Sequence, residues 1–143
     1  MKIIAAIDKN RALGRKGELL YHLPGDLKNF KAETIGKTIV MGRVTVEGLP
    51  GGKPLPGRTT LMLTRKAPLP EIPEDAIICG GAQIYDMFID MCDELILTEI
   101  DAETEDADAY FPQFKDKFQI YEEGELRTEN GVSYQINRYR RKD

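Results

Sequence analysis

Five short apolar runs, separated by segments rich in glycine, proline and charge, constrain the fold of this chain more than any other feature. Residues 3–7 are apolar at every position, which is typical of a strand buried on both faces. Similar runs occupy residues 38–41, 59–64, 76–79 and 94–100. Such strands occur in mostly parallel sheets covered by helices on both sides, so the sequence predicts an α/β fold.

Helical patterns lie between these runs. Residues 24–34 begin with Pro24, which is favoured in the first turn of a helix, and then mix apolar and charged residues. A short helix is also expected over residues 43–47. A third helix is indicated by apolar residues at helical spacing, which we interpret as core rather than as a cofactor site. These residues are Ile84, Met87, Phe88 and Met91.

Three segments are expected to be irregular. Residues 10–21 are polar and contain two glycines, and residues 48–57 are too rich in glycine and proline for regular structure. Residues 65–75 contain three prolines and are expected to form a stiff connector.

The C-terminal part has a different pattern. Residues 118–122 and 132–139 have the character of an antiparallel pair, with Asn130 and Gly131 at or near the turn. We therefore expect a single domain over residues 1–143, with a mostly parallel central sheet, flanking helices and a C-terminal antiparallel hairpin.

Charge and composition argue against several function classes. The net charge of −4 disfavours nucleic acid or an anionic membrane as a partner, because both call for a basic surface. Cys79 and Cys92 lack C-x-x-C spacing and are expected to be reduced thiols. Since His22 is the single histidine, we expect no metal site. No apolar run approaches the roughly 20 residues of a membrane span, and we expect a cytoplasmic monomer.

Glycines and basic residues follow three of the expected strands. Taken singly, such glycines are more often simple turns and such arginines are more often solvated. In α/β sheets, however, ligands bind beyond the carboxyl ends of the strands, and three such places together favour a phosphorylated cofactor. Neither a Walker A nor a G-x-G-x-x-G motif is present. The residues concerned are Gly42, Arg43, Thr64, Arg65, Gly80 and Gly81.

Two further residues are candidates for binding a substrate. Asp26 lies in the first turn of an expected helix, where a carboxylate is often only structural. It also shares a helix face with Phe30, and an acid beside an aromatic ring suits a flat heterocycle that donates hydrogen bonds. Arg58 follows a loop stiffened by Pro54 and Pro56, and is either a surface residue or a group that holds a carboxylate.

Together these segments resemble the dihydrofolate reductase family. The resemblance rests on five stretches in the family's order, which are residues 23–31, 39–45, 54–58, 79–85 and 97–102. It extends from Ile3 to about Pro112, with a weaker likeness in the hairpin beyond.

The resemblance implies reduction of 7,8-dihydrofolate to 5,6,7,8-tetrahydrofolate by NADPH, with hydride transfer to C6 and protonation at N5. It implies that Asp26 grips the pterin ring, with support from Thr98, and that Tyr21 belongs to the same centre. Arg58 would hold the glutamate tail, and antifolate inhibitors are expected ligands. The other implied substrate residues are Ile4, Ala5, Leu27, Phe30, Leu49, Leu55 and Cys79.

The resemblance also implies a cofactor site. Arg43, Thr64 and Arg65 would meet the 2′-phosphate, which favours NADPH over NADH. The loop over residues 10–21 would cover the active site. The full set of implied cofactor residues is Ala6, Leu13, Gly14, Gly42, Arg43, Val44, Thr45, Leu63, Thr64, Arg65, Gly80, Gly81, Ala82, Gln83, Ile84 and Tyr85.

This sequence departs from the family pattern at several positions. Tyr21 stands where tryptophan is usual, and Leu20 stands where proline is common. Between the third expected strand and Gly80 the chain is short, and the extra strand and helix that the family places on the adenine side do not fit. Two alternatives therefore stay open: a related pyrimidine or pterin reductase on the same fold, and a non-catalytic binding module derived from a reductase.

Overall fold

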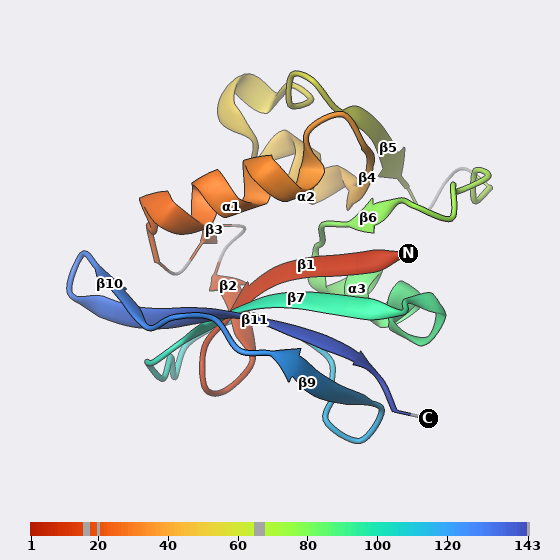
Figure 1. The fold of residues 1–143 in the computed structure, drawn as a ribbon. Helices are drawn as coiled ribbons and strands as arrows, with labels where there is room; N and C mark the ends of the chain where they lie inside the picture. Colours follow the sequence, from red (N-terminus) through yellow and green to blue (C-terminus); the bar gives the residue numbers. More distant parts are fainter. Residues whose placement is uncertain (16–17, 20, 65–67, 143) are drawn as a thin grey trace.

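The main element of the fold is a strongly twisted sheet that runs through the molecule (Figure 1). The computed structural model describes residues 1–15, 18–19, 21–64 and 68–142. Within these residues the sheet has eight strands in the order β10-β11-β7-β1-β6-β4-β5, and β9 also pairs with β11. The strands are β1 (Lys2–Ile7), β4 (Thr38–Gly42), β5 (Thr59–Leu63), β6 (Ile77–Ile78), β7 (Glu94–Ile100), β9 (Phe118–Glu122), β10 (Arg127–Glu129) and β11 (Val132–Arg141).

The centre of the sheet is parallel and its C-terminal side is antiparallel. Strand β1 pairs in parallel with both β6 and β7, and β4 pairs in parallel with β5 and β6. Strand β11 runs antiparallel to β7, β9 and β10. This arrangement confirms the expected α/β fold and places the carboxyl ends of β1, β4, β6 and β7 at one edge of the sheet.

Helices cover both faces of the sheet. Alternation along β1 directs Ile3 into a cluster with Phe88 of α3 (Ala82–Phe88), and Ile4 into a cluster with Phe30 of α1 (Pro24–Thr34). The short α2 (Arg43–Glu47) contributes Val46 to the second cluster. The three helices therefore lie where the sequence predicts them.

Residues 10–21 are not simply a loop, which corrects the sequence-based expectation. Strands β2 (Ala12–Arg15) and β3 (Glu18–Leu19) form a small sheet with β8 (Ala109–Tyr110). A turn begins it: the Asp8 carboxylate accepts from the amides of Asn10 (2.8 Å) and Ala12 (2.9 Å), while Arg11 has a positive φ of 62°. The glycines and charged residues of this segment break the alternation expected of a strand. In addition, β8, which pairs with β2, lies almost a hundred residues away in the chain.

The C-terminal hairpin contains one more strand than expected. Strand β9 does pair with β11, but the turn at Asn130 and Gly131 joins β10 to β11. Both turn residues have positive φ (51° and 76°), as a two-residue hairpin loop of type I′ requires. The prediction of an antiparallel pair is confirmed, and its assignment to a single hairpin is wrong.

Smaller corrections concern short elements and the methionine stripe. Met87 and Met91 are each 50% exposed, so of that stripe Ile84 and Phe88 belong to the core and the two methionines do not. One turn of 3₁₀ helix (Pro50–Gly52) interrupts the loop over residues 48–57, and another (Ile89–Met91) follows α3. Within the residues described, no helix is both long and apolar enough to cross a bilayer.

An ionic cluster joins α1 to the sheet. Arg138 on β11 donates to Glu33 at the end of α1, and its guanidinium also lies 3.6 Å from Glu94 and 3.3 Å from Glu122. A guanidinium shared among three carboxylates fixes the helix more firmly than an isolated surface pair would. The orientation of α1 matters because its first turn carries Asp26.

Candidate active site

Asp26 and Thr98 meet at the carboxyl end of the parallel strands. Asp26 is the third residue of α1, and Thr98 lies on β7 with its side chain toward that helix. The Thr98 hydroxyl donates a hydrogen bond to Oδ1 of Asp26, and Thr98 is buried at 2% exposure. Two of the three residues expected at the catalytic centre, which are 72 positions apart in the chain, are therefore in direct contact.

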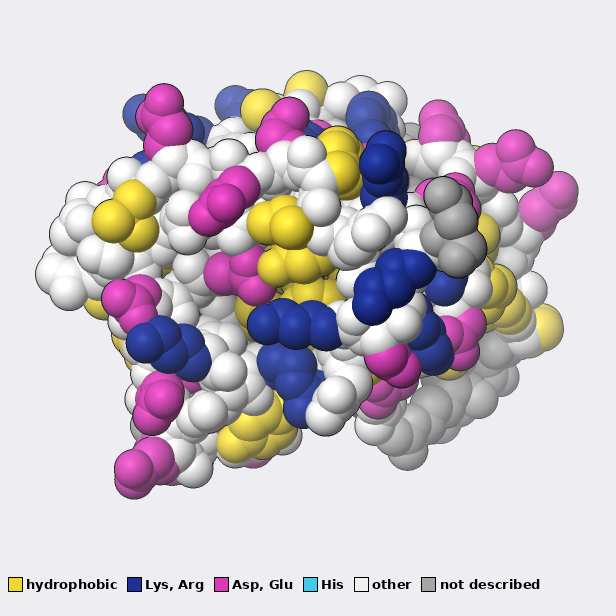
Figure 2. Space-filling view, turned by 60° about the horizontal axis from the view of Figure 1, so that its bottom comes forward, with side chains coloured by type: hydrophobic (Ala, Val, Ile, Leu, Met, Phe, Trp, Pro, Cys, Tyr) yellow, Lys and Arg dark blue, Asp and Glu magenta, His cyan; other side chains and the backbone are white. Residues whose placement is uncertain are grey.

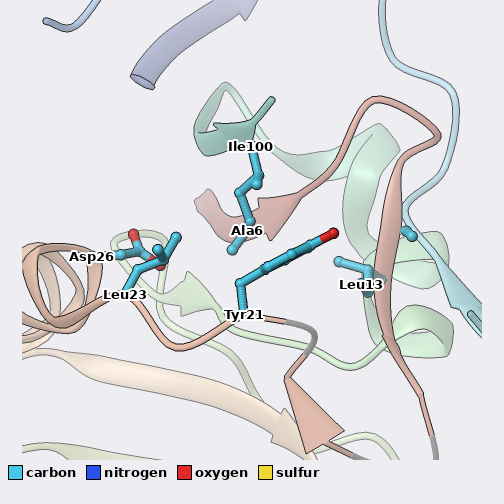
Figure 3. A pocket seen from close by; sticks show the side chains of 7 residues that line it. Ala6, Leu13, Tyr21, Leu23, Asp26 and Ile100 are labelled. Atoms are coloured by element: carbon cyan, nitrogen blue, oxygen red, sulfur yellow. The ribbon is translucent and has the colours of Figure 1, made fainter. Parts of the chain in front are cut away.

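Apolar side chains surround this pair and form a small pocket (Figure 3). Tyr21 extends from the segment before α1 toward Leu13, and its hydroxyl lies 3.2 Å from Oγ1 of Thr104. Of the described residues that line the pocket, only Asp26 carries a carboxylate. The lining residues are Ala6, Ala12, Leu13, Tyr21, Leu23, Asp26 and Ile100.

The surroundings of Asp26 favour its protonated form. Burial raises the pKa of Asp26 above its usual range, and the negative charge of Glu129 acts in the same direction. The hydrogen bond from Thr98 stabilises the carboxylate and opposes these two effects, but it is the smaller influence compared with burial. Asp26 therefore keeps its proton to a higher pH than an exposed aspartate does.

Most of the expected substrate residues lie on the α1 face of the sheet. Ile4 and Cys79 are buried there, and Phe30, Leu49 and Leu55 pack against the same cluster. Leu27 is 46% exposed on the outer part of α1.

Ala5 is a correction to this group. Its side chain packs with the α3 cluster on the opposite face of the sheet. Neighbouring residues of a strand point to opposite faces, so Ile4 and Ala5 cannot both present side chains to one pocket.

Arg58 lies next to the same face. Its Nε donates to the carbonyl of Pro56 at 3.0 Å, and the side chain is half-buried. Burial raises the pKa of the Cys79 thiol, and the positive charge of Arg58 opposes that rise.

Glycines bring the ends of β4 and β6 together. The Gly42 amide donates to the Gly80 carbonyl at 2.9 Å, and the peptide bond between Gly80 and Gly81 is cis. Gly80 has a φ of 111°, a conformation that favours glycine. A Cβ at Gly81 would stand 3.3 Å from Oγ1 of Thr45, so the backbone of Gly81 lies against Thr45 more closely than a larger residue would comfortably allow.

The remaining expected cofactor residues differ in exposure. Arg43 is largely exposed and forms a loose pair with Glu47 at 3.9 Å. Tyr85 is buried, and its hydroxyl donates to the Ile4 carbonyl at 2.7 Å. Leu63 and Ile84 pack into the α3 cluster. Arg65 lies outside the described residues. Ala6, Gly14, Thr64 and Ala82 are half-buried, whereas Val44 and Gln83 are exposed.

Sequence reasoning missed three residues of the pocket wall, Ala12, Leu23 and Ile100. Leu23 is buried directly before α1, and Ile100 follows Thr98 by two positions on β7. The period of two along a strand could have identified Ile100, because it must share a face with Thr98.

The sequence matches the dihydrofolate reductase family over residues 1–141. This chain is a member of the dihydrofolate reductase family. A dihydrofolate reductase of Neisseria meningitidis serogroup B is 38% identical, over 96% of this chain and 92% of its own length. That of Bacillus subtilis is 34% identical, over 100% of this chain and 95% of its own.

A solved structure shows the same fold. It is a dihydrofolate reductase from Enterococcus faecalis complexed with NADP(H) and RAB-propyl, with a TM-score of 0.83 and 32% identity. The match covers 99% of this chain and 96% of the other. The alignment with the Bacillus subtilis protein runs over 164 positions, whereas this chain has 143 residues. The chain therefore lacks residues at some positions that the relative fills.

Proposed function

We propose that this chain catalyses the NADPH-dependent reduction of 7,8-dihydrofolate to 5,6,7,8-tetrahydrofolate. The observation that carries the proposal is the hydrogen-bonded pair of Asp26 and Thr98 at the wall of an apolar pocket. A carboxylate accepts from two donors on one edge, which suits the ring N–H and amino group of a pterin. Family membership supports the assignment.

Asp26 would hold the proton that the reaction needs. When bound, NADPH supplies a hydride to C6. The reaction also requires a proton at N5, and Asp26 would favour this protonation directly or through water. General acid catalysis contributes typically about 10²–10⁴-fold, while positioning of the reactants contributes up to roughly 7–11 kcal/mol. Because the pKa of Asp26 is raised, we expect turnover to fall as the pH rises through that pKa.

The apolar residues around the acid would bind the rest of the substrate. Ile4, Phe30, Leu49 and Leu55 offer an apolar surface to the ring and the benzoyl group. Arg58 would form a forked pair with a carboxylate of the glutamate tail, since its stiff loop fixes the approach of the guanidinium.

The residues at the ends of β4 and β6 fit the cofactor. Gly80 and Gly81 carry no side chain, so their backbone could approach a ligand closely. The exposed ion pair of Arg43 with Glu47 is weak, so Arg43 is available to a 2′-phosphate, together with Thr64 and Arg65. Leu13, Gly14 and Tyr85 would adjoin the nicotinamide side.

The decisive experiment is a spectrophotometric assay that follows the loss of NADPH with dihydrofolate as substrate. Saturable, dihydrofolate-dependent oxidation is the expected result. Oxidation with a ribityl-phosphate pyrimidine in place of dihydrofolate would favour the alternative reductase. If titration with NADPH up to millimolar concentration gives no saturable binding, the enzyme assignment fails and the non-catalytic module is favoured.

We also propose a cytoplasmic monomer that does not act on nucleic acid or membranes. The net charge of −4 supports the partner assignment, and Figure 2 shows Lys and Arg side chains beside a strip of hydrophobic side chains, with Asp and Glu side chains mainly to either side. Sedimentation of the pure protein at micromolar concentration tests the monomer, and a dimer mass would reject it.

A further inference from the structure

The first turn of α1 lacks a cap of its own. Leu23 occupies the N-cap position and makes no side-chain hydrogen bond to the helix. The first amides of a helix have no partner within it, and they are normally satisfied by a Ser, Thr, Asp or Asn at the N-cap. Here Gly25 donates to both carboxylate oxygens of Glu129, at 2.9 Å and 3.1 Å. Glu129 comes from β10, 104 positions along the chain.

The Glu129 carboxylate is itself held in place. The Tyr134 hydroxyl donates to its Oε1 at 2.5 Å, and Tyr134 is 1% exposed in the cluster that also contains Leu23 and Ile100. The hydrogen bond from Tyr134 is the main cause of a lowered pKa of Glu129, so Glu129 is charged at neutral pH. A charged acceptor at a helix N-terminus is stabilised by the helix dipole.

The contact is tightly fitted around Gly25. A Cβ on Gly25 would lie 2.5 Å from the Tyr134 hydroxyl oxygen and 2.9 Å from Oε1 of Glu129. Since real Cβ atoms do not approach that closely, the glycine is what allows the carboxylate to reach the backbone. The next residue in the chain is Asp26.

We propose that Glu129 is a positioning residue for the reaction: its carboxylate caps α1 from the C-terminal hairpin and thereby holds Asp26 against Thr98. The proposal rests on the proposed function, because it assigns Glu129 to the same acid. In this arrangement the hairpin acts on the substrate site through the helix backbone, without touching the substrate.

The Glu129 carboxylate that caps α1 also acts on Asp26 through its negative charge. It raises the pKa of Asp26, and it faces the helix end whose dipole would otherwise favour the ionised acid. The other groups that face Asp26 are Thr98, which lowers the pKa, and the neutral phenol of Tyr85. The positive charges of Arg127 and Lys28 lower the pKa of Glu129 and so favour its ionised form.

The test compares Glu129→Gln with the control variant Glu125→Gln. Glu125 is an exposed glutamate six residues before Gly131 of the hairpin turn. Gln keeps an acceptor for Gly25 but removes the charge. The pKa of Asp26 is measured in the ligand-free protein by NMR titration of its side-chain carboxyl carbon, with the Gly25 amide shift as a second probe. We expect a lower Asp26 pKa in Glu129→Gln and no change in Glu125→Gln.

Turnover gives the functional arm of the experiment. We expect turnover of Glu129→Gln near neutral pH to fall by about threefold, because a lower Asp26 pKa reduces the protonated fraction, and we expect the pH profile to move to lower pH. Rescue in Glu129→Asp is not expected, because a shorter side chain cannot reach Gly25. The proposal is overturned if the Asp26 titration curve and the Gly25 amide shift of Glu129→Gln both equal those of the wild type. If the wild type does not reduce dihydrofolate, the proposed function fails, and the carboxyl titration still decides whether Glu129 controls Asp26.

Discussion

The substrate side and the cofactor side of the site differ in how firmly the fold holds them. Thr98 lies in the seven-residue β7, which pairs along its length with both β1 and β11. Gly80, by contrast, follows the two-residue β6, and Arg43 begins a five-residue helix and is largely exposed. A long strand that is paired on both sides therefore holds Thr98 against Asp26, whereas short elements and turns carry the groups expected to bind phosphates.

This difference predicts two kinds of variant. A change at the Asp26–Thr98 pair should alter the rate of the chemical step, because this pair faces the reacting ring, whereas a change at Arg58 should alter the affinity for dihydrofolate. A change on the cofactor side should alter affinity, because several weak contacts share the ligand. Departures from this division would show that the two sides are more strongly coupled than their contacts indicate.

Replacement of the acid should give the largest effect. Asp26→Asn keeps an acceptor for the Thr98 hydroxyl but removes the ionisable proton. We expect kcat with dihydrofolate at neutral pH to fall by about 10²–10⁴-fold, with little change in the KM for NADPH. Unchanged turnover would remove Asp26 from the mechanism.

Removal of the arginine should give the next largest effect. Arg58→Ala should weaken dihydrofolate by about 10–100-fold, the usual range for a hydrogen-bonded charge pair, and leave a tailless pterin analogue almost unaffected. The comparison is made on inhibition or substrate constants for the two ligands. Equal weakening of both would contradict a role in binding the glutamate tail.

The cofactor side is tested with Gly81→Ala. The backbone of Gly81 has φ −83°, which any residue can adopt, so the substitution adds a methyl group without strain at φ. The methyl group would stand 3.3 Å from Oγ1 of Thr45, and we expect the KM for NADPH to rise about tenfold, which corresponds to about 1.4 kcal/mol. A matched loss of affinity for dihydrofolate would break the division between the two sides.

The same contrast explains what the sequence could predict. The five central strands and three helices follow from local apolar patterns, and α1 and α2 were located to the residue. Strands β2, β3 and β8 could not be found in this way, because they are only two to four residues long and β8 pairs with β2 from almost a hundred residues away. Asp26 and Thr98 could be named from the family pattern, but the capping contact of Glu129 depends on a hairpin that local propensity does not place.

The smallest expected effect concerns stability, and it again distinguishes the two sides. Because the folded state raises the pKa of Asp26, it binds more protons than the unfolded chain between the two pKa values. Stability is therefore greatest below the usual pKa of an aspartate and is lost as the pH rises through the raised value. Asp26→Asn should abolish this loss and raise the Tm at neutral pH by a few degrees, but not under acidic conditions. Gly81→Ala, which touches no titrating group, should keep the wild-type dependence of Tm on pH. If Asp26→Asn also keeps it, the carboxyl group is solvated, and the acid is not the enclosed group that distinguishes the substrate side from the cofactor side.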